Sequence, residues 1–449
     1  MIDNVIELAV YAFFAACLLR AIKFGAFSPY FLIMIHFTLG IPIRYLVLKS
    51  TTDYYSTVLI DVVKVSSDKL FELSLGVMFF VISFEIFYAI RKKPKFALTR
   101  TIFSVPAVKK PNNSILRLIS FSVVCFFIYS LLMISSLGGI SGVIHAFSAR
   151  VSDNIEGLAY TGILGDIFIS STLLLLYLVN SQAAVRPSYK YVTYTLVALA
   201  LVLLLVQSGR GNLIQFILSI MIIQDLIKKR FTKFNFRILL IIFFVLIATV
   251  VGLATRYSAQ KNVSIESTFQ TVINNAMGSL SAPFALYDHY YLSTLYVSYK
   301  GHSYGTFYIE NALRPIPRSI WPDKPLALGK LVRQQFWGDT QGGIPPGVFG
   351  EFYIEFGIFG TILLASIFGM FFSQFHKLFL YSYKDSTLIP FVAIISPFIC
   401  FNLVRGGMDV GFTRIVIYSA SFFLLACIYK GGLKLYRIKH THSLTKVRA

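Results

Sequence analysis

Length, composition and charge together describe a membrane protein. Of 449 residues, 56% are hydrophobic and only 14% are charged, and the mean hydropathy is +0.71. Repeated apolar runs of about 18 residues or more exclude a soluble domain, and their lack of strand alternation excludes an outer-membrane barrel, so we expect an all-α integral membrane protein.

Apolar runs of helix length follow one another along the chain. The first begins after Asp3 and Glu7 without a basic leader or a clear cleavage site, so we interpret it as an anchor and not a removed signal peptide. A polar, proline-punctuated segment, residues 255–347, contains both tryptophans and separates the eighth run from the ninth. We expect one membrane domain of about eleven transmembrane helices with this large loop inserted between helices 8 and 9. The predicted spans are residues 5–22, 27–47, 70–90, 114–136, 159–179, 188–207, 211–227, 237–254, 348–373, 387–404 and 413–430.

The basic residues predict the orientation. Lys and Arg cluster in loops 91–113 and 228–237 and in the tail after residue 430, which lie on one side of the membrane if there are eleven spans. Cytoplasmic loops retain Lys and Arg, so we expect the tail on the cytoplasmic side and the loop 255–347 on the outer side of the membrane. The net charge of +21 then reflects topology and attraction to anionic membrane lipids, and no nucleic acid partner is implied.

The sequence predicts neither a metal nor a cofactor. The four cysteines lie inside apolar runs without CxxC spacing, so they are interpreted as small packing residues. His289 and His302 lack the spacing of metal ligands, and the acidic residues of the long loop contain no Asp-x-Asp pair of the kind that holds a nucleotide diphosphate through a divalent ion.

Arginines recur on the face where the topology rule disfavours them. Arg210, Arg256 and Arg405 lie at the outward ends of three separate spans, and Arg314 and Arg318 lie in the long loop. A guanidinium presents a planar fork of donors that suits phosphate, so a lipid-linked phosphate or pyrophosphate at the outer surface would explain the set. The alternative is that each arginine is an interfacial anchor that extends to the lipid headgroups.

Several motifs of the second half of the chain resemble a known family. They are Ser208-Gly209-Arg210, Thr255-Arg256-Tyr257, the segment 317–325 with Trp321-Pro322-Asp323-Lys324-Pro325, the glycine-framed segment 350–360, and Val404-Arg405-Gly406-Gly407-Met408-Asp409. In this order and spacing they resemble the bacterial O-antigen polymerase family, which includes the enterobacterial common antigen polymerase. The likeness runs from about Gln207 to the last span, and the first half of the chain agrees only in hydropathy and topology.

The resemblance implies a glycosyltransferase at the periplasmic face of the inner membrane. Such enzymes join oligosaccharide repeat units carried on undecaprenyl pyrophosphate, and they move the growing chain onto the non-reducing end of a new lipid-linked unit. The donor is then a lipid pyrophosphate, so no nucleotide sugar is needed. The resemblance alone implies a polysaccharide chain-length regulator as a partner.

This reaction assigns roles to the candidate residues. Negative charge grows on the departing pyrophosphate, so we expect Arg210, Arg256 and Arg405 to stabilise it, with Arg318 contributing from the loop. The candidate bases for the acceptor hydroxyl are Asp409, Glu351, Glu355, Asp323, Asp288 and His289. Of these, Asp409 and Glu351 are taken as catalytic. The alternatives are that Glu351 and Glu355 are buried hydrogen-bonding residues, and that Asp409 pairs with Arg405.

Aromatic residues on the same face suggest contacts with sugar. The expected substrate-binding residues are Arg314, Arg318, Trp321, Asp323, Tyr257 and Tyr353. Trp321 is also interpreted as a structural wedge that holds the proline-rich segment against the helices. Tyr290 and Tyr291 are interpreted as members of an interfacial aromatic belt.

Two other functions compete with the polymerase. An O-antigen ligase uses the same donor but transfers the glycan to the lipid A core. A flippase or exporter of lipid-linked sugars would also gather cations, yet a transporter is expected to place charges inside its spans, often with repeated halves and broken helices. The spans are mostly free of charge and no internal repeat is evident, which favours chemistry at the surface.

Overall fold

Every regular element that the structure describes is a helix. The computed structural model describes residues 2–25, 27–44, 46, 67–90, 99, 102–105, 111–139, 142, 158–206, 210–228, 286–313, 316, 320–338, 340 and 343–431. Its elements are α1 (Ile2–Lys23), α2 (Pro29–Thr38) with the π-helical turn η1 (Leu39–Ile43), α4 (Ser67–Ala89), α6 (Pro111–Ser136), α8 (Leu158–Ser181), α9 (Pro187–Val206), α10 (Arg210–Lys228), α14 (Leu286–Lys300), α15 (Thr306–Leu313), α16 (Leu328–Trp337), α17 (Gly347–Ser382), the short η4 (Ser386–Leu388) and α18 (Ile389–Lys430).

The length and the apolar composition of the helices indicate a helical membrane protein. Among the described residues, 7 helices are long and apolar enough to cross a membrane, and Pro29–Ile43 and Leu75–Ala89 are shorter apolar helices. Helices occupy every predicted span except 237–254, which lies outside the described residues. The number of spans stays a prediction.

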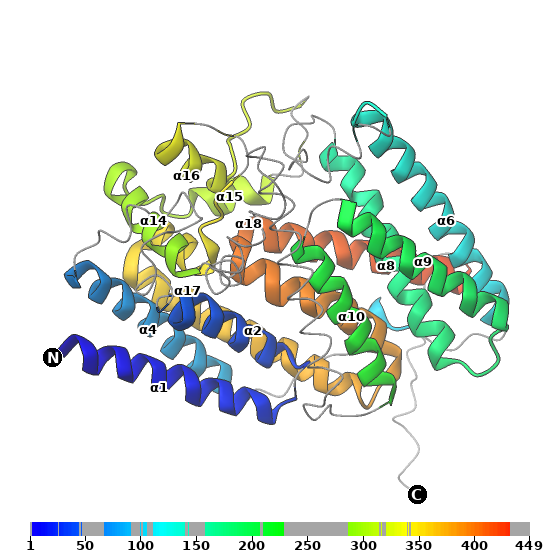
Figure 1. Ribbon diagram of the computed structural model, residues 1–449, viewed down its shortest axis with the longest axis horizontal. Coiled ribbons are helices and arrows are strands. Elements are labelled where there is room, and N and C mark those ends of the chain that lie inside the picture. The colour runs from blue at the N-terminus through cyan, green and yellow to red at the C-terminus, as the bar shows by residue number, and fades with distance from the viewer. Residues whose placement is uncertain are drawn as a thin grey trace, which may run out of the picture.

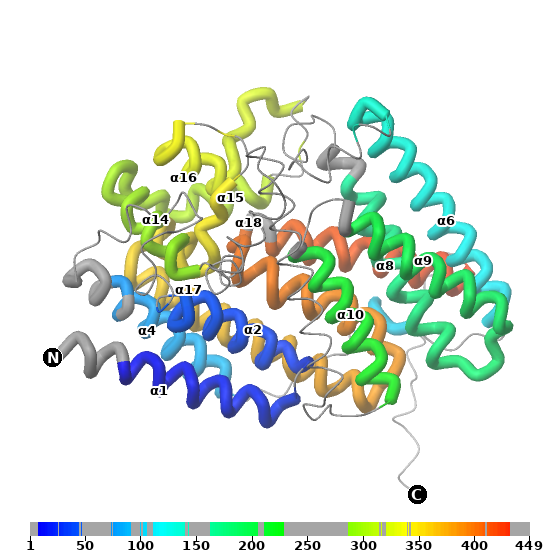
Figure 2. Tube along the Cα trace, viewed as in Figure 1, coloured from blue at the N-terminus to red at the C-terminus, as the bar shows by residue number. Residues whose placement is uncertain are grey.

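The helices form two groups with α10 and α18 between them (Figure 1). On one side α6, α8 and α9 pack together, and on the other α17 lies along α4, with α1 and α2 beside them. The short helices α14, α15 and α16 gather at one end of the molecule, as the tube in Figure 2 also shows. These three helices belong to the predicted loop 255–347, which is therefore helical over much of its described part.

Aromatic packing and one close backbone approach join α4 to α17. The ring of Phe84 lies 6.0 Å from that of Phe368 and 6.4 Å from that of Phe372, between centroids. At Gly369 a side chain would overlap the backbone carbonyl of Phe84. In lipid, helices associate through such tight packing because burial of apolar surface supplies little driving force between them.

Tyr290 and Tyr291 of α14 correct one expectation. They are only 3% and 8% exposed, and the hydroxyl of Tyr290 fills the space beside Gly76 of α4. Their rings pack inside the protein, so they do not belong to an interfacial belt. The reason is tertiary: α14 packs against α17, α16 and η1 instead of lying on the surface.

Two glycines break the helices that run towards the α14–α16 end. Gly357 in α17 has φ 67° and ψ −159°, and Gly407 in α18 has φ 76° and ψ −171°. The rings of Phe352 and Phe368 are 6.2 Å apart, and those of Phe398 and Tyr418 are 4.0 Å apart. Uninterrupted helices would separate these pairs by roughly 24 and 30 Å. Each chain segment therefore folds back on itself at its glycine.

Candidate functional site

Four distant segments meet at the break in α18. A side chain at Gly347, the first residue of α17, would lie 3.2 Å from Leu286 of α14 and 3.4 Å from the carbonyl oxygen of Val404. A side chain at Gly211 of α10 would lie 2.9 Å from the ring of Phe401. We call this place the helix junction; it comprises residues 210–211, 286–289, 347–351 and 401–408.

Among the described side chains of the junction, Arg405 is the cation. It is half-buried, and its guanidinium carbon lies 5.8 Å from the centre of the Phe401 ring. Beside it, burial and the charges of Arg405 and Arg44 lower the pKa of His289 to about 3. A lowered pKa keeps His289 neutral at pH 7, so it adds no charge to that of the Arg405 guanidinium, a group that is suited to binding phosphate.

A buried ion pair anchors α14 at the junction. Arg44 and Asp288 are 0% and 1% exposed, and Asp288 Oδ2 accepts hydrogen bonds from Arg44 Nε at 2.9 Å and from Nη2 at 2.7 Å. Burial raises the pKa of Asp288, and the Arg44 charge opposes this rise. Asp288 was a candidate base, but its carboxylate holds Arg44. The sequence pattern does not predict the role of Arg44, and its only signal is a lone arginine at the end of an apolar run.

Glu351 holds the break in α18. It is 1% exposed, and its Oε2 accepts the backbone N–H of Met408 at 2.6 Å. The first N–H groups after a helix break have no partner within the helix, so a carboxylate there acts as a cap and also favours the helix dipole. Glu351 thereby sets the position of the turn that carries Arg405, which is the buried hydrogen-bonding role left open by the sequence.

Glu355 holds the break in α17 in the same way. It is 0% exposed, and its Oε2 accepts from Ser303 Oγ at 2.9 Å and from the Gly305 N–H at 2.6 Å. In return, the N–H groups of Ser303 and Tyr304 donate to the carbonyls of Ile354 (3.1 Å) and Glu355 (2.9 Å). The segment 301–305 thus satisfies carbonyls that the break at Gly357 would otherwise leave unpaired.

The remaining predicted residues are placed less completely. Tyr353 is half-buried, with its ring 5.6 Å from Tyr290 and 5.7 Å from His302. Trp321 is half-buried and Asp323 is exposed, between α15 and α16. Arg210 begins α10 beside Gly211, but its side chain and that of Asp409 lie outside the described residues, as do Arg256, Tyr257, Arg314 and Arg318 entirely. The structure therefore places the first turn of α10, which Arg210 begins, beside Phe401, one helical turn before Arg405.

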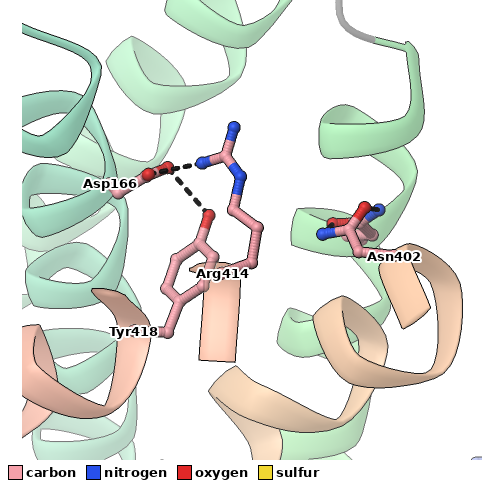
Figure 3. Close-up of polar contacts among 5 residues, drawn as sticks. Asp166, Asn402, Arg414 and Tyr418 are labelled. Carbon is pink, nitrogen blue, oxygen red and sulfur yellow. Dashed lines mark hydrogen bonds and ion pairs between the residues drawn. The ribbon is translucent and has the colours of Figure 1, made fainter. Parts of the chain in front are cut away.

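Polar side chains also meet inside the spans, where the hydropathy pattern predicts few charges (Figure 3). Arg414 forms an ion pair with Asp166 of α8, and the hydroxyl of Tyr418 donates to the same carboxylate at 2.9 Å. Nearby, Gln215 Nε2 donates to Asn402 Oδ1 at 3.1 Å. Figure 3 shows the Arg414 guanidinium extending into the space between α8 and α10. Opposite charges at such depth pair because an isolated charge would be costly there.

Comparison with known proteins adds no assignment. The chain matches no protein-family model, and no similar curated protein or solved structure was found. Function must be inferred from the helix junction and from the motif resemblance.

Proposed function

We propose that the protein is a polymerase of lipid-linked oligosaccharide repeat units, such as those of O-antigen, that acts at the periplasmic face of the bacterial inner membrane. One observation supports this most: motifs that carry the family resemblance, although far apart in sequence, are neighbours in the fold. Glu351 of the glycine-framed segment accepts the Met408 N–H. Gly211, which directly follows the Ser208-Gly209-Arg210 motif, lies against the ring of Phe401, one helical turn before Arg405. Independent interfacial anchors would not require this clustering.

The proposed donor is an undecaprenyl pyrophosphate-linked glycan. As the bond between the anomeric carbon and the pyrophosphate oxygen breaks, negative charge accumulates on the leaving group. Arg405 and Arg210 stabilise that charge from the junction, and Arg256, Arg314 and Arg318 contribute from the loop 255–347. Removing one positioned group of this kind typically costs about 10²-fold or more in rate.

The two helix breaks are a feature that the exporter alternative also predicts, because broken helices carry the binding sites of many transporters. In transporters, however, such breaks lie near the membrane midplane. Here Gly407 is the second-to-last residue of the apolar segment Ser386–Met408, and the next apolar segment, Gly411–Lys430, begins just after it, so the break lies at the end of a segment and not at its centre. Gly357 lies near the start of α17, and residues 358–382 after it are long enough to cross about 30 Å of hydrocarbon. The breaks therefore suit a site at one face.

Reconstitution separates the three candidates. Purified protein in vesicles is given a lipid-linked repeat unit alone, and the products are separated by size. A ladder of glycans without lipid A core supports the polymerase; transfer only after addition of core supports the ligase; lipid movement across the bilayer without transfer supports the exporter. Either of the last two results overturns the proposal.

Arginine variants test the mechanism in the same assay. Arg405→Ala should reduce ladder formation by about 10²-fold or more, and Arg405→Lys should restore little, because lysine keeps the charge but lacks the planar fork. Arg186→Ala, which removes an exposed arginine between α8 and α9, is the matched control and should retain activity. Full activity of Arg405→Ala would contradict the assigned role.

A further inference from the structure

A pocket lies beside the break in α17, next to the helix junction. It has a volume of about 500 Å³, and its walls come from α4, α14, the segment 301–305 and α17. Lining residues include Phe79, Thr294, His302, Tyr353 and Phe359. One lining residue, Tyr353, is already expected to bind substrate, and the junction residues Arg405 and Glu351 do not line the pocket.

The lining favours a neutral polar ligand with apolar faces. Among the described residues, no Asp, Glu, Lys or Arg lines the pocket, so this lining offers no counter-charge to a phosphate. Aromatic rings together with a few hydroxyl and imidazole groups are typical of a small-molecule pocket in which polar groups fix orientation. A sugar ring fits this chemistry, because its C–H faces pack on aromatic rings while its hydroxyls form hydrogen bonds.

His302 is held in a single orientation at the pocket. Its Nδ1 lies 3.1 Å from the carbonyl oxygen of Tyr353 and 3.3 Å from that of Ile354. Carbonyl oxygens only accept, so Nδ1 carries the hydrogen in these bonds. The opposite edge of the ring, with Nε2, faces Gly357, where an added side chain would lie 3.2 Å from Nε2. Gly357 lines the same pocket, so Nε2 is presented to it.

The pocket lies close to the junction along two helices. On α17, Gly357 of the pocket follows Glu351 of the junction by six residues, which is roughly 9 Å of helix rise. On α14, Thr294 of the pocket follows His289 by five residues, roughly 7–8 Å. This spacing places one sugar ring between a phosphate at the junction and a hydroxyl in the pocket.

We propose that this pocket binds the terminal sugar of the acceptor glycan, and that Nε2 of His302 takes the proton from its attacking hydroxyl. The inference rests on the proposed function. The acceptor oxygen forms the new bond to the donor's anomeric carbon, and its proton passes to His302. The bond from that carbon to the pyrophosphate oxygen breaks, and its electron pair leaves with the lipid pyrophosphate. His302 later returns the proton to water or to the leaving group.

His302→Asn tests the base. The asparagine amide can donate to the carbonyls as Nδ1 does, but it offers no nitrogen at the position of Nε2. We expect an unchanged melting temperature, a KM for the acceptor within about threefold of the wild type, and a loss of kcat of about 10²-fold or more. Added imidazole should restore part of the activity of His302→Ala. Thr294→Val should raise the KM for the acceptor. Ser298→Ala changes an exposed residue one turn away on α14 and should alter neither kcat nor KM.

The outcomes separate this inference from the proposed function. If the wild type forms no ladder, the polymerase proposal fails, yet binding of the lipid-free repeat-unit oligosaccharide to the pocket is still measured by saturation-transfer NMR and should weaken in Thr294→Val. If the wild type forms a ladder and His302→Asn keeps more than about a tenth of its kcat, His302 is not the base. Displacement of the oligosaccharide by undecaprenyl phosphate would show a lipid-chain site and overturn the sugar assignment. If His302→Asn does not fold, Thr294→Val is the deciding variant. An unchanged KM for the acceptor in Thr294→Val would also overturn the inference.

Discussion

At the scale of single residues, the two glutamates of α17 show how buried charge is used near the site. Glu351 and Glu355 are one helical turn apart, and each accepts a backbone N–H at 2.6 Å, from Met408 and Gly305 respectively. A buried carboxylate is costly unless such donors compensate for the lost water. Both residues therefore hold the backbone, and in the proposed reaction the base is His302.

Glu351 offers a direct test of this distinction. Glu351→Gln keeps an oxygen that can accept from Met408, so it should retain most of the thermal stability and a measurable rate. Glu351→Ala leaves the N–H without its acceptor and should cost roughly 1–3 kcal/mol of stability along with activity. Thermal unfolding in detergent and the ladder assay measure both effects. Equal inactivity of the two variants at full stability would instead identify Glu351 as a base.

His289 makes a prediction about pH. Its pKa is lowered from 6.5 to about 3 by burial and by Arg405 and Arg44, so the folded protein binds the proton more weakly than the unfolded chain does. Stability from this group is complete above pH 6.5 and falls as the pH drops from 6.5 towards 3. The melting temperature should therefore fall between pH 7 and pH 5, and it should fall less in His289→Gln. An equal fall in both proteins would contradict this account.

At the scale of elements, the breaks at Gly357 and Gly407 build the site. Only a residue without a side chain adopts these positive φ angles without strain, and both breaks also leave backbone groups that glutamates or the segment 301–305 must satisfy. The folded-back segments bring Arg405, Glu351 and His302 to one end of the molecule. Straight helices of the same composition would spread these residues along the membrane normal.

Gly407→Ala should collapse this arrangement. The new methyl group would overlap the Oε2 atom of Glu351, and alanine is strained at φ 76°. We expect a lower melting temperature and loss of activity, measured on the purified protein. Gly162→Ala in α8 is the matched control, because nothing lies within 4 Å of the added group and its helical backbone tolerates alanine. A Gly407→Ala protein as stable and active as the wild type would show that the turn adopts another backbone.

At the scale of the whole molecule, two polar clusters lie near the break in α18 at Gly407. The junction lies at the end where α14, α15 and α16 gather (Figure 1), and Asp166 and Arg414 pair close to the starts of the apolar segments Gly162–Ser181 and Gly411–Lys430. A neutral pair inside the spans holds α8 to α18 and gives no net charge for a path across the membrane. This distribution suits catalysis at one face.

The orientation of that face is open to measurement. Ser298→Cys on α14 and Lys384→Cys in the turn after α17 are exposed positions at opposite ends of the long helix of α17. A membrane-impermeant maleimide should label the first in intact spheroplasts and the second only after permeabilisation. Cys17, Cys125 and Cys400 are buried, which keeps the background low. The reverse pattern would place the junction in the cytoplasm and exclude a periplasmic polymerase.

The sequence by itself determined the class of the protein and the positions of the described helices outside the segment 255–347. Apolar runs of membrane length can only be satisfied as helices, so hydropathy located α6, α8, α9 and α10 to within a few residues. It also placed Arg210 and Arg405 at the ends of spans on one face. Those inferences depend on local composition, which needs no knowledge of neighbours.

Tertiary structure alone decided which residues meet. Arg44 and Asp288 are 244 positions apart in the chain, and Asp166 and Arg414 are 248 apart, so their pairing depends on which helices are neighbours. The same is true of His302, which is an isolated loop histidine in the sequence. In the fold, a carbonyl next to the break at Gly357, that of Tyr353, holds its ring. Helix packing and the sign of φ at two glycines are set by contacts between distant segments, and a hydropathy pattern carries no record of such contacts.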